Sequence, residues 1–256
     1  MFGFGGCCII PVRRGSKRIP GKNLKLLGNQ PLLSHILQTA LQSNCFNVHG
    51  TVVASDDPNA LRVAKDMGAI PFEIPSAMAG DDSPVTPVLA LALNALPTTP
   101  DFMCYLRATS PFVTASTIQQ AVQSFASSPR HIDSLVTVHQ VTGAHPSRYK
   151  SIDEQTGLLI DQYSDFKEGL QPTSSSSLTA LQRNSCVTVT RRETLLGTDH
   201  SIWGNQTIPL VVQDEMECLD INTPLDFEFA EYLYHSKETA TTNKTLSKTK
   251  ICLKIC

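Results

Sequence analysis

The sequence predicts an α/β protein with a Rossmann-like, mostly parallel sheet that helices cover on both faces. Three observations lead to this prediction. Strand and helix patterns alternate from residue 7 to about residue 141, which is typical of parallel strands joined by helical crossovers. The strand candidates are short apolar runs, as expected for strands that are buried on both faces. The chain has 256 residues, 41% of them hydrophobic and 17% charged, which suits one sizeable globular domain.

Short apolar runs mark the strands of this alternating region, at residues 7–12, 50–55, 70–74, 101–108 and 134–141. Apolar residues at helical spacing mark the helices between them, at residues 32–41, 59–67, 85–96 and 114–126. Pro31 suits the first position of one helix, Pro87 should lie in the first turn of another, and Gly68 is placed to end a third. Ligands of such sheets bind beyond the carboxyl ends of the strands, so the loops that follow the strands are candidate sites.

The second half of the chain has a different organisation. Residues 142–183 are polar and include the run QPTSSSS, which indicates a small inserted subdomain with loops. Further strands are expected at residues 185–190, 207–212 and 216–221, and a closing helix at residues 224–235. We therefore expect one domain over residues 7–238, followed by a disordered tail at 239–256 that is rich in Thr and Lys.

Charge and cysteine content exclude several classes of protein. A net charge of −2 argues against a general nucleic-acid binder, and no apolar stretch reaches the ~18 residues that a membrane span needs. The eight cysteines form no C-x-x-C pair and most lie in apolar runs, so neither a disulfide framework nor a structural zinc site is expected. The start, MFGFGGCCII, lacks the charged residues and cleavage pattern of a signal peptide, so a reduced, cytoplasmic setting is expected.

The segment RRGSKRIPGKN, residues 13–23, carries five basic residues and no acidic one. It lies between the first buried strand and a helix, where main-chain N–H groups, a helix N-terminus and basic side chains together bind phosphate. It is not a Walker A loop, because five residues rather than four separate Gly15 from Gly21, and Asn23 stands where that loop has Ser or Thr. The alternative is an ordinary solvated basic loop, which requires neither the two glycines nor the proline.

Four segments, in order along the chain, resemble the sugar cytidylyltransferases. The opening IIPVRRGSKRIPGKN resembles that family's A-R-x-G-S-K-x-I-P-x-K-N motif, and VASDD at 53–57 resembles its V-S-T-D-D. LRATSPF at 106–112 resembles L-Q-x-T-S-P, and LDINTPLD at 219–226 resembles I-D-I-D-T-P-x-D. Within the family the chain is most similar to the acylneuraminate and related nonulosonate enzymes. The Kdo enzymes are further away, since they carry Q-G-D-E-P where this chain has RATSP.

The resemblance implies a nucleotidyltransferase-type fold and a magnesium-dependent enzyme that transfers CMP from CTP to the anomeric hydroxyl of a nonulosonic acid, releasing pyrophosphate. It also implies a homodimer formed through residues 142–183. No nucleic-acid or membrane partner is expected, because of the net charge and the lack of a long apolar stretch. Such a reaction is catalysed mainly by positioning and by stabilising charge on phosphate oxygens, so the site needs cations and N–H donors. Two alternatives stay open: a nucleotidyltransferase for another sugar acid such as Kdo, and a catalytically inactive nucleotide-binding homologue.

Carried onto this chain, the family's motifs imply three groups of site residues. The catalytic residues are expected to be Arg13, Lys22 and Asp220. CTP is expected to contact Arg13, Gly15, Ser16, Lys22, Asn23, Asp81 and Ser83, the glycine and Ser16 through main-chain N–H groups. The sugar acid is expected to contact Arg107, Thr109, Ser110 and Arg148. Lys17 and Arg18 have no assigned role, and a solvated position suits Arg18.

Magnesium is expected at Asp220, with Asn222 as a second oxygen ligand. Mg2+ takes one or two carboxylates and completes its octahedron with phosphate and water oxygens. The family often has Asp at the position of Asn222, so the amide brings an oxygen but no charge. From the residues alone, an Asp-x-Asn pair after a strand also fits a turn or a helix cap, and Thr109 and Ser110 likewise fit a cap.

Three further positions bear on these expectations. Arg107 stands where the family usually has Gln, and Ile74 where it often has an Arg near the cytidine. QRNSCVT at 182–188 replaces the R-P-N-G-A-I-Y strand of the sialic-acid enzymes, so sugar recognition should differ most here. Asp56 or Asp57 is expected to cap the helix that follows rather than to take part in catalysis.

Overall fold

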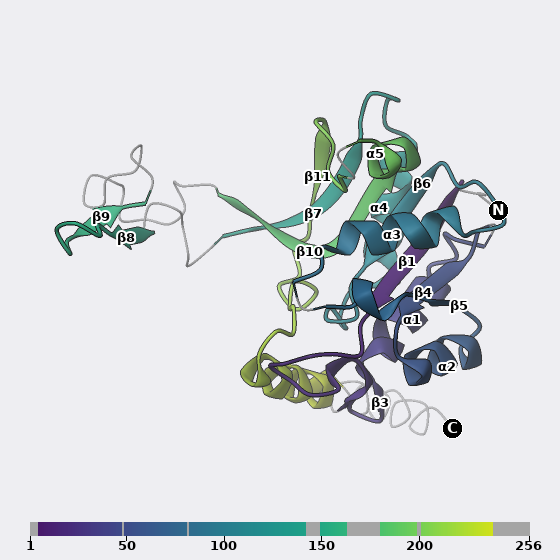
Figure 1. Ribbon diagram of the computed structural model, residues 1–256, viewed down its shortest axis with the longest axis horizontal. Coiled ribbons are helices and arrows are strands. Elements are labelled where there is room, and N and C mark those ends of the chain that lie inside the picture. Colours follow the sequence, from purple (N-terminus) through teal and green to yellow (C-terminus); the bar gives the residue numbers. More distant parts are fainter. Residues whose placement is uncertain are drawn as a thin grey trace, which may run out of the picture.

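A seven-stranded sheet, in the order β11-β7-β10-β6-β1-β4-β5, forms the centre of the protein (Figure 1). The computed structural model describes residues 5–47, 49–80, 82–141, 149–162, 180–198 and 201–237. The strands of the sheet are β1 (Gly6–Val12), β4 (Thr51–Ser55), β5 (Ile70–Glu73), β6 (Phe102–Leu106), β7 (Ser134–Gln140), β10 (Leu181–Arg191) and β11 (Thr207–Val211). β10 runs antiparallel to both of its neighbours and the other pairs are parallel, which confirms the mostly parallel sheet.

Helices cover both faces of this sheet. They are α1 (Leu32–Gln42), α2 (Pro58–Asp66), α3 (Val85–Asn94), α4 (Ala115–Ala126) and α5 (Arg192–Leu196), together with a helix over residues 224–237. Cys8 and Ile10 of β1 pack in one core with α1, α2 and α4, whereas Cys7 and Ile9 pack in a second core with α3 and α5. A strand that is buried on both faces has to be apolar along its whole length, which explains the run CCIIPV.

The predicted helix ends agree closely with the structure. Asp57 caps α2, because its carboxylate accepts a hydrogen bond from the N–H of Asn59 (2.9 Å). Gly68 follows α2 with a φ of 84°, a conformation that glycine adopts without strain. Pro87 lies in the first turn of α3, while Pro31 directly precedes α1 instead of being its first residue.

The region 142–183 is described only in part. Residues 142–148 and 163–179 lie outside the described residues. Between them, β8 (Lys150–Ile152) and β9 (Leu159–Asp161) form a hairpin that extends away from the sheet (Figure 1). The division of the chain into a 7–238 domain and a tail at 239–256 stays a prediction, since the tail also lies outside the described residues.

The later strands agree with the prediction in two cases out of three. β10 is longer than the strand expected at 185–190, and β11 confirms the strand near 207–212. The strand expected at 216–221 is wrong. The N–H groups of Glu217, Cys218 and Leu219 instead donate to carbonyls three residues earlier, so the segment is a series of turns. The buried Glu217 carboxylate holds these turns against the start of α4, where it accepts a hydrogen bond from the Thr117 hydroxyl (2.6 Å).

A third apolar core joins the C-terminal helix to the basic loop. Ile19 and Leu27, on either side of the short helix η1 (Lys22–Leu24), pack with Ile221, Phe227 and Ala230. Two short strands of two residues each, β2 (Leu26–Leu27) and β3 (Gln30–Pro31), form a hairpin in the same region. The closing helix predicted at 224–235 is confirmed as a helix over residues 224–237. It packs against the residues on either side of η1. Among the described residues, no helix is long and apolar enough to cross a membrane.

Candidate active site

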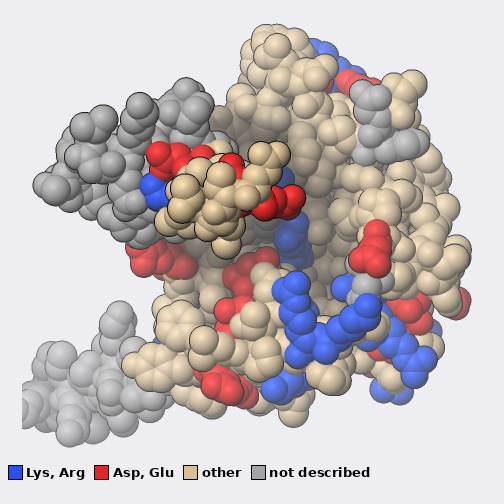
Figure 2. All heavy atoms as spheres, turned by 60° about the vertical axis from the view of Figure 1, so that its left-hand side comes forward, with Lys and Arg blue, Asp and Glu red and all other residues tan. Residues whose placement is uncertain are grey.

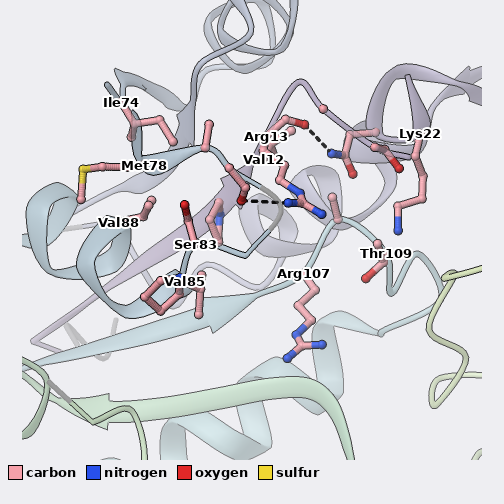
Figure 3. A pocket seen from close by; sticks show the side chains of 18 of the residues that line it. Val12, Arg13, Lys22, Ile74, Met78, Ser83, Val85, Val88, Arg107 and Thr109 are labelled. Carbon is pink, nitrogen blue, oxygen red and sulfur yellow. Dashed lines mark hydrogen bonds between the residues drawn. The ribbon is translucent and has the colours of Figure 1, made fainter. Parts of the chain in front are cut away.

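A pocket of about 510 Å³ lies beyond the carboxyl ends of β1 and β6, where ligands of such sheets bind (Figure 3). Two kinds of side chain line it. The apolar side is formed by Ile74, Met78, Val85 and Val88, and the basic side by Arg13 and Lys22 (Figure 3). The described lining residues include Arg107 as a third cation and no Asp or Glu, so the local field favours an anion. Lys and Arg side chains gather on the face shown in Figure 2, with some Asp and Glu side chains near them.

Hydrogen bonds hold the basic loop at several points. The guanidinium of Arg13 donates to the carbonyl of Gly80 (Nη1–O 3.0 Å), and the amide of Asn23 donates to the carbonyl of Arg13 (3.1 Å; Figure 3). The N–H of Arg14 donates to the carboxylate of Asp56 (2.7 Å). Asp56 thus secures the loop while its neighbour caps α2, and neither carboxylate lines the pocket.

The two glycines of the loop have different tasks. Gly21 has a φ of 64° and directly precedes η1, a left-handed conformation that favours glycine. A Cβ at Gly15 would meet no protein atom within 4 Å, and both Gly15 and Ser16 line the pocket. Gly15 and Ser16 therefore border space that a phosphate can enter, and Gly15 has no side chain that would fill it.

Lys22 connects the loop to the segment that carries Asp220. Its Nζ donates to the carbonyl of Ile221 (2.7 Å), and the N–H of Ile221 donates to the carbonyl of Thr109 (2.9 Å). Burial lowers the pKa of Lys22, the negative charge of Asp220 opposes this, and the positive charge of Arg13 adds to it. A half-buried lysine beside a second cation is stabilised by a bound anion.

Asp220 and Arg107 form an ion pair at the edge of the pocket. Nη1 of Arg107 lies 3.6 Å from Oδ2 of Asp220, and the same oxygen accepts a hydrogen bond from the amide of Asn222 (3.0 Å). Oδ1 of Asp220 and Nε of Arg107 are buried and have no hydrogen-bond partner among the described residues. A buried polar atom without a partner is costly, so Oδ1 is a candidate position for contact with an ion or a ligand.

The cap alternative for Asp220 and Asn222 fails, because other side chains cap the helix at 224–237. Oδ2 of Asp226 accepts hydrogen bonds from the N–H groups of Thr223 (2.7 Å) and Asn222 (2.9 Å), and the Thr223 hydroxyl accepts one from the N–H of Asp226 (3.2 Å). Burial acts to raise the pKa of Asp226, but these hydrogen bonds outweigh it and the pKa is lowered. The carboxylate of Asp220 is thus not needed by the helix.

Thr109 and Ser110 do not cap a helix either. α4 begins after Thr114, whose hydroxyl accepts a hydrogen bond from the N–H of Thr117 (3.2 Å). Thr109 lines the pocket, whereas Ser110 is fully buried and does not line it. The hydroxyl of Ser110 has no partner within the described part of the chain.

Comparison with known proteins decides the family. The family model described as cytidylyltransferase matches residues 7–234, nearly all of the described chain. The chain belongs to the cytidylyltransferase family. A CMP-N,N'-diacetyllegionaminic acid synthase of Legionella pneumophila is 30% identical over 236 residues, which are 91% of this chain and 97% of that protein. A pseudaminic acid cytidylyltransferase of Campylobacter jejuni is 36% identical over 122 residues, which are 46% of this chain and 52% of that protein.

Solved structures show the same fold. A CMP:2-keto-3-deoxy-manno-octonic acid synthetase complexed with CTP superposes with a TM-score of 0.64 at 17% identity, over 91% of this chain and 99% of the other. A 4-diphosphocytidyl-2C-methyl-D-erythritol synthase from Anaerococcus prevotii gives 0.62 at 11% identity, over 91% and 97%. These likenesses confirm the nucleotidyltransferase-type fold.

In this cytidylyltransferase the pocket brings most of the expected site residues together. Those that line it are Arg13, Gly15, Ser16, Lys22, Asn23, Ser83, Arg107, Thr109 and Asn222. Asp220 lies beside them through its contact with Arg107. Asp81 and Arg148 lie outside the described residues. The roles of all these residues in binding and catalysis stay predictions.

Tyr105 is a pocket residue that was not predicted from the sequence. Its side chain lines the pocket at the end of β6, with the guanidinium of Arg107 5.6 Å from its ring. Burial raises the pKa of Tyr105, while the positive charges of Arg107 and Arg183 act to lower it. A tyrosine among the apolar residues of a buried strand (FMCYL) is the one signal that could have indicated it, because a buried hydroxyl needs a polar neighbour.

The residues at the pocket fit a metal that takes most of its ligands from a substrate. No group of three or more His, Cys, Asp or Glu side chains in the described ranges is arranged to hold an ion. Oδ1 of Asp220 is nevertheless a buried carboxylate oxygen with no partner there, and Mg2+ binds with as few as one or two carboxylates when phosphate oxygens complete its shell.

Proposed function

We propose that this protein transfers CMP from CTP to the anomeric hydroxyl of a nonulosonic acid and releases pyrophosphate. The observation that supports the proposal is one pocket in which the basic loop, with Arg13 and Lys22, meets the Asp220 segment in a member of the cytidylyltransferase family. The names of its relatives support a sugar acid as the acceptor, since they refer to legionaminic, pseudaminic and N-acylneuraminic acids.

In the proposed reaction the anomeric oxygen attacks the α-phosphorus of CTP in line with the bond to pyrophosphate. The new P–O bond forms as the old one breaks, and the hydroxyl proton leaves to solvent. Negative charge grows on the leaving pyrophosphate, where Arg13, Lys22 and the main-chain N–H groups of Gly15 and Ser16 stabilise it. The hydrogen bond from Lys22 to Ile221 fixes the position of this cation before the substrate arrives.

The apolar side of the pocket suits the cytosine ring and the ribose. Ile74 is buried there in place of the Arg that the family often has, so no cation from this position reaches the base. The segment next to it is tied to the basic loop by the bond from Arg13 to Gly80. We therefore assign base recognition to this segment, which includes Ser83 and Asp81, rather than to an arginine.

We propose that magnesium is the metal of this reaction. Asp220 would hold it, with Asn222 as a neutral second ligand, and the ion would supply positive charge to the phosphate oxygens. The ion pair with Arg107 already neutralises part of the charge of Asp220. The affinity of the protein alone for the ion is therefore expected to be low, and CTP should bring the ion with it.

We also propose a homodimer formed through the region 142–183. The β8–β9 hairpin leaves large apolar side chains 45–69% exposed, namely Ile152, Leu158, Leu159 and Ile160. The helix at 224–237 leaves others 50–72% exposed, namely Leu225, Phe229 and Tyr232, beside a second pocket of about 630 Å³. Monomers seldom leave such surfaces in water, and packing of one subunit's hairpin on the other's helix would cover both. A molar mass of one chain by light scattering would contradict the dimer.

The cysteines support the cytoplasmic setting that we propose. The six described cysteines are free thiols and five of them are buried. Burial raises the pKa of Cys7 to about 12, so this thiol stays protonated and packs as an apolar side chain.

The decisive experiment incubates the purified protein with CTP, MgCl2 and a panel of 2-keto sugar acids, including legionaminic, pseudaminic, N-acetylneuraminic and Kdo acids. Pyrophosphate release and the mass of the CMP-sugar are measured. We expect release with at least one nonulosonic acid. Preference for Kdo would favour the first alternative, and no release with any acceptor would overturn the proposal. Calorimetry with CTP, UTP, GTP and ATP separates a cytidylyltransferase from an enzyme for another nucleotide.

A further inference from the structure

We propose that Arg183 is the residue that recognises the carboxylate of the acceptor sugar, and that Trp203 positions it. This inference rests on the proposed function, because a nonulosonic acid brings one carboxylate in addition to the charges of CTP. Arg183 lies in the segment 182–188, where the sequence departs from the sialic-acid enzymes. Neither residue belongs to the phosphate-binding loop.

β10 pairs with β6, whose end carries the pocket residues Tyr105 and Arg107. Val187 pairs with Leu106, the last residue of β6, so residues 181–186 run on beyond the point where β6 ends. Arg107 begins the turn after β6, and in Figure 3 its side chain points away from the basic loop toward the green strand β10. A sugar that attacks the α-phosphate from the side opposite the pyrophosphate lies toward this strand.

Arg183 brings a positive charge to this strand. Its side chain is exposed, and its guanidinium carbon lies 4.4 Å from the ring of Trp203. The charge of Arg183 acts on the hydroxyl of Tyr105, as do the charges of Arg107 and Asp220. The geometry places Arg183 in the same part of the protein: it precedes Val187, the partner of Leu106, by four residues, and Trp203 packs in the core that also contains Tyr105 and Ile74 of the pocket.

Among the described residues of the site, the other cations have an anionic partner or are assigned to CTP. Arg107 lies 3.6 Å from Asp220, and Arg13 and Lys22 lie on the phosphate side. In the part of the chain that the structure describes, no ion pair joins Arg183 to a carboxylate. A planar guanidinium binds a carboxylate through two parallel hydrogen bonds, which a single lysine cannot reproduce.

Trp203 gives Arg183 a fixed platform. The indole is half-buried and packs against the second core, and the carbonyl of Trp203 accepts hydrogen bonds from the hydroxyls of Ser134 and Thr207. Stacking on the indole leaves the N–H edges of the guanidinium exposed to a ligand. It also restricts the side chain before binding, so less conformational entropy is lost when the sugar binds.

The test compares Arg183→Gln with the wild type. We expect the KM for the sugar acid to rise between about tenfold and a hundredfold, the effect of losing a charge-assisted hydrogen-bonded pair. The kcat and the calorimetric affinity for CTP should stay within about twofold, because Arg183 contacts neither the phosphates nor the reacting atoms. The methyl ester of the sugar acid provides the second arm. The variant should use this ester as well as the wild type does. An unchanged KM, or equal losses for acid and ester, would overturn the proposal.

Two comparisons separate recognition from structural damage. Arg130→Gln, which removes an exposed arginine paired with Glu193, should leave the KM unchanged. Trp203→Leu should raise the KM for the acid with little change in kcat, and Trp203→Phe should restore most of the loss because it keeps an aromatic platform. A rise in KM that Trp203→Phe does not restore would contradict the positioning role.

Two measurements distinguish a failure of the proposed function from a failure of the Arg183 assignment. A wild type that releases no pyrophosphate with any acceptor contradicts the proposed function before any variant is made. Calorimetric titration of the sugar acid into the CMP-bound protein then still tests Arg183, because it needs no turnover. Binding that Arg183→Gln weakens would support the inference. No binding to the wild type would overturn it together with the function.

Discussion

The side chain of Lys22 donates a hydrogen bond to the carbonyl of Ile221 (Nζ–O 2.7 Å), 199 residues further along the chain. The bond joins the basic loop to the residue next to Asp220. An ammonium group has three N–H donors, so two remain for a ligand. Ile221 also packs with Phe227 and Ala230 of the C-terminal helix. A shift of this helix is therefore expected to move the carbonyl that holds Lys22 in place.

Lys22→Ala should lower kcat/KM for CTP by at least about a hundredfold, because it removes a preorganised cation from the developing pyrophosphate charge. Pyrophosphate release measures the loss, and circular dichroism melting shows whether the domain stays folded. The matched control is Arg18→Ala in the same loop, since Arg18 is exposed and does not line the pocket. This control should keep its activity within about twofold. Full activity of Lys22→Ala would remove the loop from the mechanism.

Asn222→Asp tests whether the single carboxylate of Asp220 is sufficient for metal binding. A second carboxylate should lower the Mg2+ concentration for half-maximal activity by roughly tenfold, because it adds a charged oxygen ligand beside the first. Without metal the variant should melt at a lower temperature than the wild type. It loses the hydrogen bond from Asn222 to Asp220 (3.0 Å) and places like charges together.

The same variant distinguishes an active enzyme from an inactive homologue. A wild type that already turns over with Mg2+ dismisses the inactive alternative. If instead the wild type has almost no activity and Asn222→Asp gains a large amount, the site of this chain has decayed. Melting curves with and without MgCl2 give a reading that does not depend on turnover.

The first half of the fold could be predicted because local and tertiary signals agree there. A strand that is buried on both faces needs an unbroken apolar run, and CCIIPV is one. The prediction of a strand at 216–221 was wrong because the local pattern and the tertiary packing disagree there. Met216, Leu219 and Ile221 are apolar because they pack around the C-terminal helix, and such burial produces a strand-like pattern without a paired neighbour. The turns are held in place by the contact of Glu217 with Thr117 of α4. These two residues are far apart in the sequence, so no local pattern predicts the turns.

From the residues alone, the candidate site could be predicted only where its chemistry is local, and its distant residues were expected only from the resemblance to the family's motifs. Glycines and cations directly after the first strand indicate a phosphate loop without any knowledge of the fold. The ion pair of Arg107 with Asp220 depends on how β6 and the 220 segment meet, and no spacing in the sequence encodes it. The stacking of Arg183 on Trp203 likewise needs the course of β10 past the end of β6.

Asp226→Asn should destabilise the protein by about 1 kcal/mol at neutral pH, because it weakens the cap of the helix at 224–237. The pKa of Asp226 is lowered from its ordinary value of 3.8. A carboxyl whose pKa falls on folding stabilises the protein above the ordinary value, and this stabilisation disappears as the pH drops through the lowered one. The difference in free energy of unfolding between wild type and variant, measured in urea, should therefore shrink below about pH 3.8. A difference that is constant with pH would show that the charge of Asp226 contributes nothing to the cap.

Gly28→Ala, which adds a single methyl group, should lower the free energy of unfolding strongly. Gly28 has a φ of 63°, and a Cβ there would lie 2.2 Å from the ring of Tyr234 on the C-terminal helix. Left-handed strain costs roughly 1–2 kcal/mol and the clash adds about 1–3 kcal/mol. Gly157→Ala is the matched control, because Gly157 has a φ of 69° but no atom within 4 Å of the added Cβ. Urea unfolding should show the strain alone in the control and the larger loss in Gly28→Ala.

The Gly28 variant also connects stability to activity. If the helix at 224–237 shifts to relieve the clash, the carbonyl of Ile221 moves away from Lys22, and kcat/KM should fall at temperatures where the protein is still folded. Combining Gly28→Ala with Tyr234→Ala removes the clash but not the strain, so it should restore activity more fully than stability. Equal losses of stability in Gly28→Ala and Gly157→Ala, with unchanged activity in both, would show that the helix does not control the site.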